Sequence, residues 1–170
     1  MKTLLIIGAG GHGKVVAEIA MAVGYQKIAF LDDNAPEAIG KIRDIEKWMD
    51  YTEGFCGIGN NYVRKEINTK LMEAGYRIPV LIHPTAYISE SAIIGAGTVV
   101  EPKAIINTNS VIGCGSIVSV GAIVDHNVNI GEYAHINTGS IVKAGGKIEE
   151  FEKLEAGEVR WGYKSAIVKK

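Results

Sequence analysis

An aliphatic residue recurs at every sixth position through the second half of the chain. The series has eleven members without a break, namely Ile88, Ile94, Val100, Ile106, Ile112, Val118, Val124, Ile130, Ile136, Val142 and Ile148. A period of six is typical of a hexapeptide β-helix, in which each unit forms a short strand and a turn. No single unit buries its apolar side alone, so successive coils must stack. The repeat therefore predicts a parallel β-helix of about four coils, each made of three hexapeptides.

The six-residue register weakens after Ile148. Glutamates interrupt it at positions 149, 150, 152 and 155, and Leu154 is the last aliphatic residue in phase. Charged residues can cap the open end of a solenoid, which is the role that terminal repeats play. We therefore expect a β-helix with a shortened C-terminal end, followed by a tail.

The β-helix should also present apolar residues on its outside. The residues that precede the inward aliphatic positions are themselves aliphatic in much of the repeat: Ile93, Val99, Ile105, Val111, Ile117 and Ile123. Such a number is too large for a solvated surface, so we expect these faces to be covered in an oligomer.

The first half of the chain alternates strand-like and helix-like patterns. Apolar, β-prone runs at 2–8, 27–33, 54–59 and 78–84 are typical of parallel strands. Helical periodicity follows the first run and returns at 61–75. The order strand, helix, strand, irregular segment, strand, helix, strand predicts a small Rossmann-like α/β lobe.

These patterns divide the chain into three parts. We expect the α/β lobe at 1–84, the β-helix at 85–156 and the tail at 157–170. The fold class is thus α/β followed by β, and 170 residues suffice for two small domains.

Composition excludes several classes of function. The formal net charge of −1 gives no basic footprint for nucleic acid. Cys56 and Cys114 form neither a metal-binding spacing nor a disulfide framework, which fits a reducing compartment. The apolar N-terminal run is too short for a signal peptide, and no stretch is long enough to span a bilayer. We therefore expect a cytoplasmic protein without a metal, a nucleic-acid partner or a membrane partner.

The stretch "GAGGHGKVV", residues 8–16, has the G-x-G-x-x-G spacing of a nucleotide-binding turn. A complete dinucleotide fold uses two β-α-β-α-β halves, whereas residues 1–84 supply little more than one. A mononucleotide is therefore favoured over NAD, although a nicotinamide-dependent enzyme stays an alternative.

Several residues of this lobe are candidate ligand contacts. The free amides at the helix start should hold an anion, with Gly10, Gly11 and His12 in contact with it. Gly10 and Gly13 are expected to need a positive φ and a close approach to phosphate, which valine would prevent. Asp32 and Asp33 end the second strand where ligands of α/β sheets bind, the alternative being a solvated turn.

Five segments together resemble the sugar O- and N-acetyltransferases of the sialic acid and bacillosamine pathways. They are "GAGGHGKVV", "FLDD", "IGNN.VRK", "LIHPTA.IS" and "VDHNVNIGEYAHI", in this order within residues 3–148. The resemblance implies a left-handed β-helix and a homotrimer. It also implies that the lobe, including Gly59 and Asn60, holds the nucleotide of a UDP- or CMP-linked sugar. Acetyl-CoA would then lie along the β-helix between subunits, near His135 and Ala144.

The same resemblance places the general base on His126. An amine or hydroxyl must lose a proton as it attacks a thioester, and imidazole titrates near neutral pH. Members of the family follow this histidine with a carboxylate, whereas this chain has Asn127 there and Asp125 on the other side. Side chains one residue apart diverge in extended structure.

We therefore expect an acetyl-CoA-dependent N- or O-acetyltransferase of a sugar nucleotide, with Asp125 and Asn127 beside the base. The alternative is a catalytically impaired relative that binds a sugar nucleotide and has a scaffold or regulatory role in polysaccharide synthesis.

Overall fold

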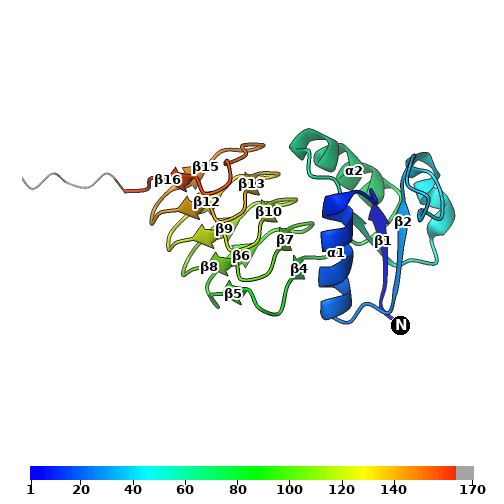
Figure 1. Cartoon of the computed structure of the whole chain (residues 1–170), viewed down its shortest axis with the longest axis horizontal. Coiled ribbons are helices and arrows are strands. Elements are labelled where there is room, and N and C mark those ends of the chain that lie inside the picture. Colours follow the sequence, from blue (N-terminus) through cyan, green and yellow to red (C-terminus); the bar gives the residue numbers. More distant parts are fainter. Residues whose placement is uncertain (164–170) are drawn as a thin grey trace, which may run out of the picture.

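A computed structural model of the chain describes residues 1–163, so the part of the expected tail at 164–170 lies outside the described residues. An α/β lobe at the N-terminus lies beside a stack of coils built from two-residue strands (Figure 1).

The lobe is built on a parallel sheet in the order β2-β1-β3. Its elements are β1 (Thr3–Ile7), α1 (Gly11–Ala22), β2 (Lys27–Leu31), the 3-10 helix η1 (Ile42–Trp48), β3 (Glu53–Cys56) and α2 (Asn61–Glu73). Every residue of β1 is buried, as its apolar run predicts. Leu4 and Ile6 share a core with α1, while Leu5 and Ile7 share another with η1 and α2. The alternation of strand side chains thus places a helical layer on each face of the sheet.

The β-helix has three parallel sheets, which we call faces 1, 2 and 3. Face 1 contains β4 (Leu81–Ile82), β7 (Val99–Val100), β10 (Ile117–Val118) and β13 (His135–Ile136). Face 2 contains β5 (Tyr87–Ile88), β8 (Ile105–Ile106), β11 (Ile123–Val124), β14 (Ile141–Val142) and β16 (Val159–Arg160). Face 3 contains β6 (Ile93–Ile94), β9 (Val111–Ile112), β12 (Asn129–Ile130) and β15 (Lys147–Ile148). Each strand pairs with the strand one coil further along, as β7 does with β10 and β10 with β13.

The periodic aliphatic residues line the inside of these coils. From Val100 to Ile148 they belong to one buried core, and Ile88 and Ile94 pack against it. The repeat and its four coils are therefore confirmed.

The strand expected in the lobe at 78–84 lies in the β-helix instead. Leu81 pairs with Val99, which makes β4 the first strand of face 1. The lobe assignment of this strand is therefore wrong. A signal was present, because Ile82 lies in phase with the repeat that continues at Ile88.

An incomplete coil follows Ile148. Lys153 bridges to His135, Leu154 is fully buried, and β16 pairs with β14. Part of the segment expected as a tail thus extends face 2.

The lobe covers face 1 of the β-helix. The side chains of Leu81, Val99 and Ile117 share one core with Val16 and Ile19 of α1. Val99 and Ile117 were expected among the outward residues that an oligomer would cover, and this expectation is wrong because α1 buries them. Faces 2 and 3 keep their outward apolar side chains, with Ile93 64% exposed.

Candidate functional site

The glycine turn between β1 and α1 has one positive φ, at Gly8 (φ +102°). Gly10 has a φ of −69°, and a Cβ there would meet nothing within 4 Å. A Cβ on Gly13 would lie 2.0 Å from the carbonyl oxygen of Gly8. The expected positive φ at Gly10 and Gly13 is therefore wrong. Gly13 is required by packing inside the lobe, whereas Gly10 and Gly11 leave open space above the turn.

Asp32 holds this turn in place. Its Oδ2 accepts a hydrogen bond from the amide of Ala9 (2.9 Å), and its Oδ1 accepts from the amides of Asn34 (2.8 Å) and Ala35 (3.0 Å). These backbone donors lower the pKa of the Asp32 carboxyl. The side chain thus joins the end of β2 to the glycine turn.

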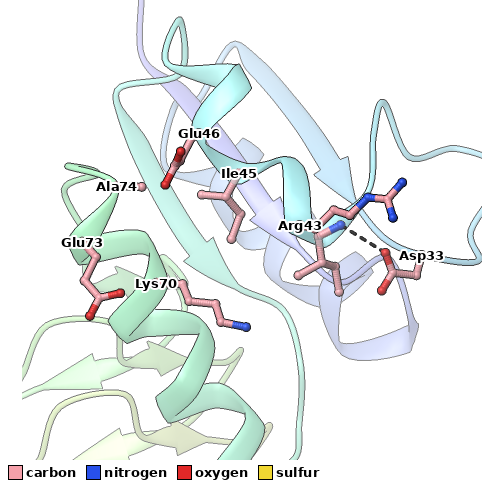
Figure 2. Close-up of a pocket in the computed structure, with 8 residues that line it drawn as sticks. Asp33, Arg43, Ile45, Glu46, Lys70, Glu73 and Ala74 are labelled. Carbon is pink, nitrogen blue, oxygen red and sulfur yellow. Dashed lines mark hydrogen bonds between the residues drawn. The ribbon is translucent and has the colours of Figure 1, made fainter.

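Asp33 lies on a different surface. Together with residues of η1 and α2 it lines an outer cavity of about 440 Å³ (Figure 2). Its Oδ1 accepts a hydrogen bond from the amide of Ile42 at 3.2 Å. No residue of the glycine turn lines that cavity. Asp32 therefore contacts the glycine turn, whereas Asp33 borders a separate cavity.

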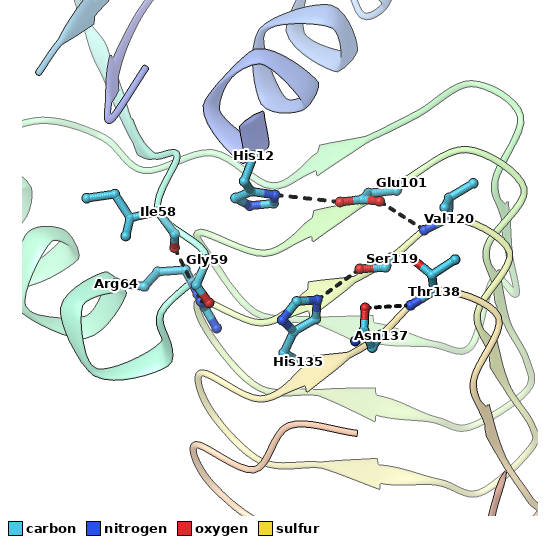
Figure 3. Close-up of polar contacts among 10 residues, drawn as sticks. All are labelled: His12, Ile58, Gly59, Arg64, Glu101, Ser119, Val120, His135, Asn137 and Thr138. Carbon is cyan, nitrogen blue, oxygen red and sulfur yellow. Dashed lines mark hydrogen bonds and ion pairs between the residues drawn. The ribbon is translucent and has the colours of Figure 1, made fainter. Parts of the chain in front are cut away.

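His12 and Glu101 meet where α1 begins above face 1 (Figure 3). The His12 Nδ1 lies 3.7 Å from the Glu101 Oε1, and the side chains are 18% and 10% exposed. Burial, assisted by the positive charge of Arg64, lowers the pKa of His12 to about 4. His12 is therefore neutral near pH 7. Although the two atoms are close enough for an ion pair, the contact joins a neutral ring to a carboxylate.

Sequence reasoning missed Glu101. Its Oε2 accepts a hydrogen bond from the amide of Val120 (2.9 Å), and burial raises the pKa of its carboxyl. The repeat contained a signal for its position. Glu101 directly follows the inward Val100, just as Ser119 directly follows the inward Val118 one coil later. Polar residues at this place of successive coils form a column at one corner of the β-helix.

His135 lies near His12, where the lobe meets face 1 (Figure 3). Its Nε2 is 3.0 Å from the Ser119 hydroxyl, and its Nδ1 is buried without a partner among the described residues. Burial, with the positive charges of Lys153 and Arg64, lowers the pKa of His135 to about 4. Two neutral imidazoles thus line the contact between lobe and β-helix.

Arg64 of α2 joins the lobe to the β-helix. Its guanidinium is buried and donates hydrogen bonds to oxygens of Gly59 (3.0 Å), Asn61 (2.8 Å), Gly115 (2.6 Å) and Tyr133 (3.0 Å). Within residues 1–163 it forms no salt bridge, and burial lowers its pKa to about 10. Its charge therefore acts on the neighbouring histidines without a carboxylate to offset it.

Asn60 caps α2. Its Oδ1 accepts hydrogen bonds from the amides of Tyr62 and Val63, both at 3.1 Å. Gly59 and Asn60 also border a cavity of about 270 Å³ together with Asn61, Tyr62 and Lys153. The side chain of Asn60 thus caps α2, while a Cβ on Gly59 would meet nothing within 4 Å.

His126 lies at the corner between faces 2 and 3, where it is exposed. Asn127 has a φ of +56°, and its Nδ2 is 2.9 Å from the His126 Nδ1. Asp125 turns its Oδ1 to the backbone amide of His126 (2.7 Å) rather than to the ring. The expected divergence of Asp125 and the imidazole is therefore confirmed.

A cavity of about 500 Å³ lies beside this corner. It is lined by Asp125, Ile141, Lys143, Ala144, Trp161, Gly162 and Tyr163. The Lys143 Nζ lies 3.6 Å from the centre of the Trp161 ring, and the Tyr163 ring is 6.5 Å from that of His126. Ala144 thus lines a space next to the proposed base.

The predicted site residues fall into two groups in one chain. His12 and His135 lie between the lobe and face 1, whereas Asp125, His126 and Ala144 lie at or beside the corner between faces 2 and 3. Within residues 1–163, no cluster of His, Cys, Asp and Glu could hold a metal ion, and no helix has the length and apolarity to cross a membrane.

Comparison with known proteins identifies the N-terminal lobe and finds a curated relative. The family model of the PglD N-terminal domain matches residues 3–71. UDP-N-acetylbacillosamine N-acetyltransferase of Bacillus subtilis (strain 168) is 34% identical over 114 residues, which are 59% of this chain and 51% of that enzyme. The match thus spans about half the length of this curated relative.

Solved structures match over nearly the whole chain. The acetyltransferase domain of PglB from Neisseria gonorrhoeae FA1090, in complex with acetyl coenzyme A, is 34% identical with a TM-score of 0.80, and the match covers 94% of this chain and 93% of that one. PerB from Caulobacter crescentus, in complex with CoA and GDP-perosamine, is 29% identical with a TM-score of 0.80 over 92% of this chain and 87% of that one. The chain therefore belongs to the family of sugar acetyltransferases in which a PglD-type N-terminal lobe precedes a left-handed β-helix.

Proposed function

We propose that the protein transfers the acetyl group of acetyl-CoA to an amine of a nucleotide-linked sugar, with His126 as the general base. The observation that carries the proposal is the exposed imidazole of His126 beside the cavity lined by Ala144 and Trp161. The names of the Bacillus and Caulobacter relatives favour nitrogen over oxygen as the acceptor.

The chemistry requires a base at the moment of attack. The sugar nitrogen forms a bond to the thioester carbonyl carbon, the carbon–sulfur bond breaks, and the proton of the amine passes to His126. The imidazole then returns that proton to the departing thiolate. Only a ring that is unprotonated at the nitrogen facing the amine can begin this sequence.

Asn127 can orient His126 in either sense. With its amide nitrogen toward Nδ1 it donates, and the proton of the ring must then be on Nε2. With its amide oxygen toward Nδ1 it accepts, and Nε2 is free to act as the base. A carboxylate at this position could only accept, so the amide is a weaker positioning group.

We infer that the site is completed by a homotrimer. Face 2 carries an outward apolar row formed by Tyr87, Ile105, Ile123, Ile141 and Val159, of which Tyr87 is 58% exposed. If neighbouring subunits pack along this row, the corner at His126 of one subunit can approach the cleft at His135 of the next. Acetyl-CoA would then lie between two subunits, with Ala144 of one subunit and His135 of the next in contact with it.

A binding protein without transferase activity is the second candidate. The observation that favours it is the missing carboxylate at the base, since Asp125 bonds to backbone and Asn127 is neutral. Such a protein would keep the nucleotide-sugar contacts of the lobe and lose the proton transfer.

A thermal-shift screen separates the candidates. Acetyl-CoA, GDP-perosamine, UDP-sugars, CMP-sialic acid and NAD would each be added to the purified protein. Ligands that bind the folded state raise the melting temperature by mass action, by an amount that follows concentration and affinity. We expect shifts with acetyl-CoA and one nucleotide sugar and none with NAD. A shift with a nucleotide sugar alone would support the binding protein.

Substitution of His126 tests the base directly. His126→Ala should lower acetyl transfer, measured by thiol release, by about 10²–10⁴-fold with little change in the affinity of either substrate. Glu90→Gln is the control, because Glu90 is an exposed side chain between β5 and β6 of the first coil. Equal activity of His126→Ala and wild type would place the base elsewhere.

Replacement of Asn127 by aspartate should raise the rate of acetyl transfer, whereas loss of His126 should lower it. Asn127→Asp supplies a carboxylate that can only accept from the ring, which fixes Nδ1 as the protonated nitrogen and stabilises the imidazolium formed during transfer. We expect a higher rate, provided that proton transfer limits turnover. If neither wild type nor Asn127→Asp transfers acetyl to any nucleotide sugar, the binding protein is the correct description.

A further inference from the structure

A cavity of about 310 Å³ lies between α2 and the corner that leads from face 3 to face 1. Asn68 and Met72 of α2 line it on one side, and the coils line it on the other with Ala96, Cys114 and Glu132. The glycine turn, the proposed base and the cavity beside that base contribute none of these residues. The space is therefore separate from the proposed transferase site.

The repeat explains why this corner is hollow. Ala96, Cys114 and Glu132 occupy the same place on three successive coils, and the first two of these side chains are small. The coils stack directly here, because the amide of Gly115 donates to the Ala96 carbonyl and the amide of Tyr133 donates to the Cys114 carbonyl, both at 2.8 Å. A Cβ on Gly115 would lie 2.3 Å from the Tyr133 ring. The ring therefore lies against the preceding coil, where it forms one wall of the cavity.

Asn68 brings an unpartnered polar atom to this space. The residue is 3% exposed, and within residues 1–163 its Oδ1 has no hydrogen-bond partner. Buried amide oxygens are nearly always paired, because an unpaired one has lost its bonds to water without gaining others. An N–H or O–H group that enters the cavity would supply the missing donor.

The other lining residues define the kind of molecule that fits. Met72 and Ile78 offer apolar contacts, and the Tyr133 ring can pack against a second aromatic ring. Methionine adapts to irregular shapes and makes favourable contacts with aromatic rings. Glu132 is exposed at the same corner, and its carboxylate disfavours anions. The volume lies at the lower end of the range for small-molecule sites, about 300–1,000 Å³, so one or two rings suit it.

We propose that this cavity binds an uncharged aromatic molecule of one or two rings, whose N–H or O–H donates to the Asn68 Oδ1. The site is independent of the proposed transferase function, since none of the residues assigned to that chemistry lines it. Asn68 lies one turn after Arg64 on α2, and Arg64 donates to the carbonyl of Tyr133. A molecule held between α2 and the coils therefore strengthens the contact between the lobe and the β-helix. The corner does not border face 2, so a trimer formed through face 2 leaves it accessible.

Indole and benzofuran test the proposal as a probe pair, because they share a bicyclic shape and only indole has a donor. Cys114 reports occupancy, since it lines the cavity and is half-buried, whereas Cys56 is 1% exposed. The rate at which iodoacetamide alkylates Cys114 would be followed by mass spectrometry at rising probe concentrations, without acetyl-CoA or a nucleotide sugar. We expect saturable protection by indole, and an affinity for benzofuran that is about 10-fold lower.

Variants separate the cavity from the hydrogen bond. Ala96→Leu places a larger side chain at the exposed edge of the cavity and should abolish protection by indole, measured as the ratio of rates with and without the probe. Asn68→Leu removes the amide and should make the affinities for indole and benzofuran equal. Thr69→Leu, on the exposed side of the same helix, is the control and should leave protection unchanged.

Three results would overturn the proposal: no protection of the wild type by indole, equal affinities of the wild type for the two probes, or full protection in Ala96→Leu. The probe pair tests the hydrogen bond in the wild type, so the test stands even where Asn68→Leu does not fold. Because no substrate is present, failure here would leave the proposed transferase function unchanged, and an inactive enzyme would leave this site unchanged.

Discussion

At the scale of single residues, the buried guanidinium of Arg64 joins the lobe to the β-helix. One guanidinium satisfies carbonyl oxygens of the lobe and of two coils, including those of Gly115 and Tyr133. A buried acceptor that loses its donor costs about 1–3 kcal/mol. The side chain thus joins the end of the loop before α2 to two coils of the β-helix.

Arg64→Met should therefore lower the free energy of unfolding by about 3 kcal/mol or more, since several buried carbonyl groups lose their donor together. Lys70→Met on the exposed side of the same helix is the control and should change it by less than about 0.5 kcal/mol. Denaturant titration followed by circular dichroism measures both. A change of under about 1 kcal/mol in Arg64→Met would mean that water replaces the guanidinium.

Arg64 also marks a limit of prediction from sequence. Its place in "IGNN.VRK" is part of the resemblance, yet arginine in an amphipathic helix is ordinarily solvated. Its burial depends on Gly115 and Tyr133, which are distant in sequence. Glu101 is similar, because its importance arises only once α1 lies above it. Contacts of this kind depend on how two domains pack, which local patterns do not encode.

At the scale of elements, two glycines of the turn between β1 and α1 have different roles. Gly13 is required for packing inside the lobe, whereas Gly10 is expected to leave room for a ligand. Gly13→Val would force a Cβ against the Gly8 carbonyl and should destabilise the lobe, with a fall in melting temperature of several degrees. Gly10→Val meets open space and should fold normally, while it weakens nucleotide-sugar binding by blocking approach to the amides.

Melting curves and calorimetry on the two variants check this pair. Both glycines belong to the same G-x-G-x-x-G motif, so a difference between the two variants would come from their different surroundings in the fold. Normal affinity in Gly10→Val would indicate that phosphate does not approach the backbone at this position.

The elements themselves were largely predictable because each has a strong period. The six-residue repeat located the coils, and the apolar runs located β1, β2 and β3. The error at β4 arose because a short apolar run suits a buried strand of any parallel sheet. The burial of Val99 and Ile117 could not be predicted, since the pattern shows that a side chain points outward and not what covers it.

At the scale of the whole molecule, we expect the outward apolar row on face 2 to form the contact between copies of the chain. Ile105→Glu places a charge in the middle of this row and should convert a trimer into monomers, because burying an unpaired charge is costly. Met21→Glu, on an exposed part of α1, should leave the trimer unchanged. Light scattering at micromolar concentration distinguishes the states, and a monomeric wild type would contradict the trimer.

The pairing of each strand with the strand one coil further along has an evolutionary consequence. Adjacent strands lie about 4.8 Å apart, so the gain or loss of a complete coil would move all later residues by that rise without changing their face. Arg64 reaches Gly115 and Tyr133, one coil apart, and is fixed to both. A coil duplicated between them would therefore break the contact, whereas one added beyond Leu154 would leave it unchanged. Natural variation in coil number should thus be found at the far end of the stack and be absent beneath the lobe.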